Sequence, residues 1–77
     1  MKKPDVTLSL TRDQALVLFE WLTREDEKGA IPVSHPAEQR VFWDLESMLE
    51  SALAEPFASN YDEILAAARS RLTNEEG

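Results

Sequence analysis

The chain has 77 residues, of which 43% are hydrophobic, and it contains no cysteine. This length suits one small domain of marginal stability, and the lack of cysteine excludes disulfides and thiolate metal sites. Fifteen acidic side chains face eight Lys and Arg, which gives a formal net charge of −7. Twelve of the acids but only three of the bases lie between residues 13 and 63, so the negative field argues against nucleic acids and anionic membranes as partners.

Residues 6–10 alternate apolar and polar side chains, which is the pattern of a half-buried β-strand. Val6, Leu8 and Leu10 share the apolar side of this segment, the only strand signal in the sequence. Because a lone strand leaves its backbone groups unpaired, we expect residues 1–10 to form an extended arm that needs a partner. Three partners satisfy this need: a second copy in a dimer, the sheet of another protein, or the chain's own helices.

The first helix is predicted over residues 11–24. Thr11 and Gln14 have the spacing of a capping box, and Gly29 suits the C-cap after a break at residues 25–27. Apolar side chains lie on two sides of this helix, which is typical of a central helix. One side holds Ala15, Leu18, Phe19 and Leu22, and the other holds Val17 and Trp21.

The second helix is predicted over residues 37–54, after a proline-containing loop in which Ser34 or His35 is the expected N-cap. Its broad apolar stripe is expected to face the core and contains Val41, Phe42, Leu45, Met48, Leu49, Ala52 and Leu53. Pro56 cannot continue this helix, and the third helix is predicted over residues 60–72. Residues 1–77 are therefore expected to form a single all-α domain, a three-helix unit with a short extended or β-like N-terminal arm.

The sequence contains no recognisable catalytic or metal-binding constellation. His35 is the only histidine, and nothing near it resembles the serine and orienting group of a nucleophilic site. Glu46 and Glu50 share a helix face, but no histidine or further oxygen ligand completes a metal site. With only Gly29 and Gly77, the chain also lacks a glycine-rich phosphate loop, so we expect neither an enzyme nor a bound cofactor or metal.

The two tryptophans point to a binding surface. Trp43 falls on the acidic side of the second helix, about 150° from its core stripe, and Trp21 falls on the secondary face of the first helix. Tryptophan is enriched at interface hot spots, although residues 1–10 or the loop 30–36 folding over the indoles would instead make a second small core. The predicted partner-binding residues are Trp43, Asp44, Glu46, Glu50, Trp21, Glu25, Asp26 and Glu27.

Four segments carry a family resemblance: VTLSLT at 6–11, ALVLFEWL at 15–22, AEQRVFWDLE at 37–46 and EPF at 55–57. Together with Tyr61 and the run Ala67-Ala68-Arg69, they resemble a group of small, acidic, uncharacterised bacterial proteins over most of the chain. This resemblance implies no activity. In size and charge the chain also resembles bacterial immunity proteins, which bind and neutralise toxin domains, and this second likeness implies a protein partner.

We therefore expect an inhibitor of immunity or antitoxin type, which holds a basic, nuclease-like toxin domain against its acidic, aromatic-anchored surface. The alternative is a structural or regulatory homo-oligomer that pairs through residues 6–10 as a homodimer. No apolar run reaches the roughly 7–15 residues of a signal-peptide core or the ~20 of a membrane span, so a cytoplasmic location is expected.

Overall fold

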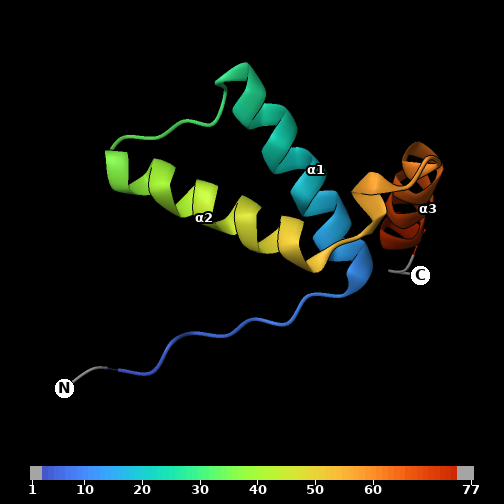
Figure 1. The fold of residues 1–77 in the computed structure, drawn as a ribbon, viewed down its shortest axis with the longest axis horizontal. Helices are drawn as coiled ribbons and strands as arrows, with labels where there is room; N and C mark the ends of the chain where they lie inside the picture. Colours follow the sequence, from blue (N-terminus) through green and yellow to red (C-terminus); the bar gives the residue numbers. More distant parts are fainter. Residues whose placement is uncertain (1–2, 75–77) are drawn as a thin grey trace.

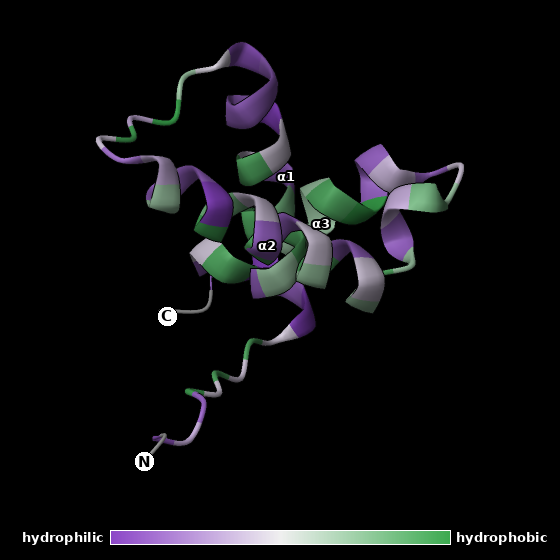
Figure 2. Cartoon of the chain, turned by 60° about the vertical axis from the view of Figure 1, so that its left-hand side comes forward, coloured by the Kyte–Doolittle hydropathy of each residue, from purple (hydrophilic) through white to green (hydrophobic). Residues whose placement is uncertain are grey.

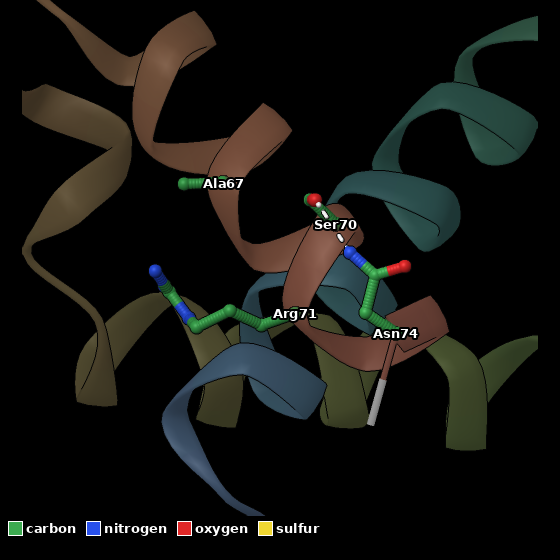
Figure 3. Close-up of a pocket in the computed structure, with 4 residues that line it drawn as sticks. All are labelled: Ala67, Ser70, Arg71 and Asn74. Atoms are coloured by element: carbon green, nitrogen blue, oxygen red, sulfur yellow. Dashed lines mark hydrogen bonds between the residues drawn. The ribbon is translucent and has the colours of Figure 1, made fainter. Parts of the chain in front are cut away.

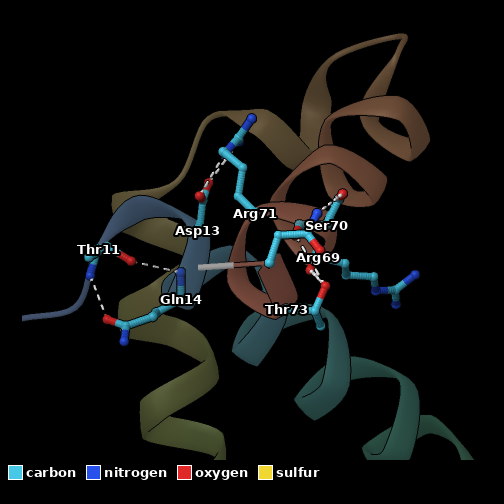
Figure 4. A network of polar contacts seen from close by, with 8 residues as sticks. Thr11, Asp13, Gln14, Arg69, Ser70, Arg71 and Thr73 are labelled. Carbon is cyan, nitrogen blue, oxygen red and sulfur yellow. Dashed lines mark hydrogen bonds and ion pairs between the residues drawn. The ribbon is translucent and has the colours of Figure 1, made fainter. Parts of the chain in front are cut away.

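The first helix of the computed structural model, which describes residues 3–74, is α1 (Arg12–Lys28). The capping box is confirmed: the Thr11 hydroxyl accepts from the Gln14 amide at 3.1 Å, and the Gln14 side chain accepts from the Thr11 amide at 2.9 Å (Figure 4). The C-cap is Gly29, whose φ of 66° lies in the left-handed region that favours glycine.

The predicted break at residues 25–27 is wrong, because α1 continues for four residues beyond residue 24. Glutamate is a good helix former, and the Glu25 carboxylate accepts hydrogen bonds from Arg24 Nε at 3.2 Å and Lys28 Nζ at 3.5 Å. These two cations offset the electrostatic repulsion between acidic side chains and the C-terminal end of the helix, where the helix dipole is negative. The helix therefore ends only where Gly29 allows the backbone to turn.

The second helix, α2 (Pro36–Ala52), begins as the sequence predicts, with His35 as N-cap and Pro36 in the first turn. The His35 Nδ1 atom accepts a hydrogen bond from the Ala37 amide at 3.0 Å, so the single histidine acts here as a helix cap. The helix ends two residues earlier than predicted, because Leu53 adopts an extended conformation that turns its side chain into the core.

A short 3₁₀ turn, η1 (Glu55–Phe57), leads to α3 (Tyr61–Asn74), which runs two residues beyond its predicted end at residue 72. The described residues 3–74 are thus all-α, as predicted, with no strand. None of the helices in this part of the chain combines the length and the apolar character needed to cross a membrane.

A small core forms around α1, which packs against α2 on one side and α3 on the other (Figure 1). This arrangement confirms the prediction that α1 is central, because its apolar side chains lie on two faces. The buried side chains come from all three helices and both connections: Ala15, Leu16, Leu22, Ile31, Leu49, Leu53, Leu65 and Ala68.

The apolar stripe predicted for α2 is only partly buried. Of its seven members, Leu49 and Leu53 are in the core and Phe42 and Leu45 pack partly against it, whereas Val41 and Met48 are more than 60% exposed. Figure 1 shows α1 and α2 close together near the end of α2 and separating toward the loop that joins them. Because α2 meets only α1 along this stretch, one edge of its apolar stripe has no covering element.

The predicted N-terminal strand is not formed in the described part of the chain. Residues 3–10 extend away from the helices without regular structure (Figure 1), and every one of their side chains is exposed. No backbone hydrogen bond between residues 3–10 and the rest of the described chain holds them. A strand requires a neighbouring strand, and one chain supplies only one. Residues 1–2 of the predicted arm, and residues 75–77 of the predicted domain, lie outside the described residues.

Candidate functional site

Trp43 lies in the middle of α2 with 54% of its surface exposed. An indole this exposed is not enclosed, so the second small core considered from the sequence does not form around it. Glu46 and Glu50 follow Trp43 at positions three and seven residues later, which places all three on one side of the helix. The predicted combination of an exposed indole with acidic neighbours is therefore present on α2.

Glu46, which lies three residues after Trp43, belongs to a group of four carboxylates, and two of them come from the end of α1. Burial raises the pKa of Glu46 above its ordinary value of 4.5, and the nearby carboxylates of Asp26, Glu27 and Glu50 raise it further. Within residues 3–74, no Lys or Arg forms an ion pair with any of these four groups. We call Asp26, Glu27, Glu46 and Glu50 the acidic face.

The structure assigns the other predicted acids to ion pairs outside the acidic face. The Asp44 carboxylate accepts from Arg40 Nε at 3.1 Å one turn earlier on α2. The Glu25 carboxylate is paired with Arg24 and Lys28, and the hydrogen bond from Arg24 is the main cause that lowers its pKa. Both groups are locally neutralised, so they add less to the negative potential than the acidic face does.

Trp21 belongs to a different side of the molecule. It is 42% exposed and lies five residues before Asp26 on α1, about 140° around the helix axis from the acidic face. Trp21 therefore lies away from the acidic face, on the secondary face of α1 where the sequence predicted it.

Gln39 is a residue near Trp43 in the helix that the sequence did not single out. It lies one turn before Trp43 on α2, and its side-chain Nε2 atom is buried with no hydrogen-bond partner among the described residues. A buried polar atom without a partner is uncommon in a folded domain. Its spacing of four residues from Trp43 was the only signal available in the sequence, and that spacing also describes many ordinary surface residues.

Two of the bases, Arg12 and Arg71, are engaged at the opposite end of α1. Arg71 donates two hydrogen bonds of 2.8 Å to Asp13 (Figure 4), and Arg12 donates to Glu55 at 2.6 and 3.0 Å. The hydrogen bonds from Arg12 are the main cause that lowers the pKa of Glu55 to about 2. Charge is therefore balanced around the start of α1 and left unbalanced around its end.

A shallow depression on α3 offers no reactive chemistry. It is open and lined by Ala67, Ser70, Arg71 and Asn74 (Figure 3), and its only ionisable group, Arg71, is held by Asp13. Among residues 3–74, no three His, Asp or Glu side chains are placed to hold a metal ion. Comparison of the chain with protein-family models, with curated proteins and with solved structures gives no significant match.

Proposed function

We propose that this protein is a protein-binding inhibitor of immunity or antitoxin type, which holds a basic, nuclease-like toxin domain against the acidic face with Trp43 as its anchor. The observation that supports the proposal most directly is the exposed indole of Trp43 three residues before Glu46, which belongs to a group of four carboxylates that no base of the described chain neutralises. A large aromatic side chain bordered by charge is a common arrangement at protein interfaces.

The electrostatics favour a basic partner. Carboxylates held close together repel one another, and this repulsion adds to the larger effect of burial in raising the pKa of Glu46. A cationic surface would remove this repulsion on binding, and it would associate faster because the net charge of −7 attracts it. Nuclease domains fit this description, because their clefts carry positive charge to hold phosphate groups.

Every predicted partner-binding residue except Trp21 has a role in this proposal. Trp43 fills a pocket on the partner, while Asp26, Glu27, Glu46 and Glu50 pair with its Lys and Arg side chains. Asp44 and Glu25 lie at the rim, where exposed ion pairs contribute little. A toxin that cleaves nucleic acid acts where nucleic acid is found, so the proposal also places this protein in the cytoplasm.

The test uses the open reading frame that adjoins this gene, expressed alone and together with this chain in a bacterial host. We expect the neighbouring product to slow growth, and we expect co-expression of this chain to restore it. With both proteins purified, Trp43→Ala should weaken the measured affinity by about 30-fold, the effect of losing a hot-spot residue worth about 2 kcal/mol. Affinity should also fall as salt is raised.

Trp21→Ala is the matched control, because it removes a second indole of similar exposure that lies outside the acidic face. We expect it to retain affinity within about threefold, well below the effect of a hot-spot residue. Equal losses for the two variants would mean that Trp43 is not the anchor. An adjoining product that neither binds this chain nor is inhibited by it would count against the proposal as a whole.

A second candidate function rests on the exposed arm. We propose that residues 6–10 become a strand only when another strand lies beside them, because their apolar side chains and backbone groups are unpaired within residues 3–74.

A further inference from the structure

An apolar groove lies between the arm and α2, on a side of the molecule separate from the acidic face. One wall is formed by the arm and the other by the helices, and the lining residues are Val6, Leu8, Leu10, Leu18, Leu45, Met48 and Leu49. Figure 2 shows hydrophobic positions along the arm, which runs away from the helices. Met48 lies five residues after Trp43, so it is about 140° around α2 from that indole.

The groove is open in the single chain. Val6 is 87% exposed and Leu8 is 80% exposed, although both have the strand pattern that normally accompanies burial. Residues 5–10 make no backbone hydrogen bond to the rest of the described chain. The arm therefore lacks both a cover for its apolar side and a neighbour for its backbone, and one added strand would supply both.

We propose that the arm of a second copy of this chain fills the groove, so that two arms form an antiparallel ribbon about a two-fold axis at Leu8. In this register Leu8 faces its own equivalent, Val6 faces Leu10, and Thr7 faces Ser9. All apolar side chains then lie on one side of the ribbon, over Leu45 and Met48 of α2. The arm is thus complementary to itself, as a two-fold interface requires.

The exposed apolar area matches what a dimer of this size needs. If complete burial of an aliphatic side chain removes about 100 Å² of apolar surface, then Val6, Leu8, Leu10, Val41 and Met48 together expose on the order of 350 Å² per copy. Two copies bring about 700 Å², which is the apolar part of an interface near the lower end of the standard range of about 1,200–2,000 Å².

Charge also permits a second copy at this place, in spite of the net charge of −7. Residues 3–12 contain two basic side chains, Lys3 and Arg12, and one acidic side chain, Asp5. The unpaired carboxylates of the acidic face lie on the other side of α2, so pairing through the arms keeps those of the two copies apart. The dimer leaves both acidic faces accessible, and it does not depend on the function proposed for them.

The first test is the mass of the purified full chain in solution, measured by sedimentation equilibrium at concentrations around 50 µM. We expect twice the chain mass of 8.7 kDa. Leu8→Lys places two ammonium groups against each other at the two-fold axis, and it should raise the dissociation constant at least tenfold. Thr7→Lys is the matched control, because its side chain points to the opposite side of the ribbon and should leave the dimer intact.

Neither substitution should alter the circular dichroism of the helices, because residues 7 and 8 lie outside them and are exposed. A wild-type chain that stays a monomer throughout, because the arm folds onto its own α2 or awaits a different protein, overturns the proposal. So does a dimer that Leu8→Lys leaves unchanged. Trp43→Ala should not affect the mass, which separates this inference from the function proposed for the acidic face.

The second test determines the register of the two arms by disulfide cross-linking. Because the chain has no cysteine of its own, only the introduced cysteine can cross-link. Directly opposed residues of antiparallel strands have Cα atoms about 4.5–5.5 Å apart, within the range of a disulfide. Leu8→Cys should therefore form a covalent dimer on oxidation, whereas Val6→Cys faces Leu10 of the other copy and should cross-link at least tenfold more slowly. Equal cross-linking at the two positions, or none at residue 8, would overturn the register.

Discussion

Replacing Glu46 with Gln should stabilise the fold, because the acidic face is electrostatically unfavourable in the absence of a partner. The half-buried Glu46 carboxylate lies beside Asp26, Glu27 and Glu50, and no base of the described chain offsets this charge. A like-charge neighbour at a partly exposed position costs about 0.2–0.5 kcal/mol. Three such neighbours give a gain of about 1 kcal/mol for Glu46→Gln at neutral pH and low salt.

The assay is urea unfolding followed by circular dichroism. With a slope of about 1 kcal/mol per molar urea for so small a protein, the midpoint should rise by about 1 M. High salt should reduce the difference between the variants by screening the carboxylates. Because the folded-state pKa of Glu46 is raised, the destabilisation exists above that pKa and disappears as the pH falls below the ordinary value of 4.5.

Glu55→Gln is the matched control, since it makes the same chemical change at a carboxylate that holds Arg12. We expect it to lower stability, opposite in sign to Glu46→Gln. If Glu46→Gln is neutral or destabilising at low salt and neutral pH, the acidic face is not a concentration of unfavourable charge. The electrostatic reason for a basic partner would then be lost.

Two further predictions concern stability. The pKa of Glu55 is held at about 2 chiefly by hydrogen bonds from Arg12. The contribution of Glu55 to stability is therefore present above about pH 4.5 and is lost as the pH falls toward 2. Urea midpoints should decline across this pH range, and Glu55→Gln should flatten the decline. Leu22→Ala, at the most buried large side chain, should lower stability by about 2–5 kcal/mol and leave much of the chain unfolded by circular dichroism. Phe57→Ala, at a 77% exposed position, should change stability by less than about 1 kcal/mol. Similar effects for both variants would contradict the assigned core.

Features that depend on near neighbours in the chain were predictable from the sequence. The capping box of Thr11 and Gln14, the left-handed Gly29 and the His35 cap each rest on contacts between residues no more than five positions apart. Helix periodicity likewise predicted an exposed indole at Trp43. The error at residues 25–27 arose because a run of acids was interpreted as a turn, although Arg24 and Lys28 allow the helix to continue.

The sequence by itself determined three capped helices, a strongly negative charge and a strand-like arm without a strand beside it. Only the tertiary structure decided which side chains of these elements are exposed together on one surface. α2 packs against α1 along one side, and the uncovered edge of its apolar stripe leaves Met48 exposed in an apolar groove. The packing of α1 on α2 also brings Asp26 to Glu46 across 20 positions of sequence. Helix periodicity specifies the angle of a side chain around its own axis, but the neighbours that it meets depend on how the helices cross.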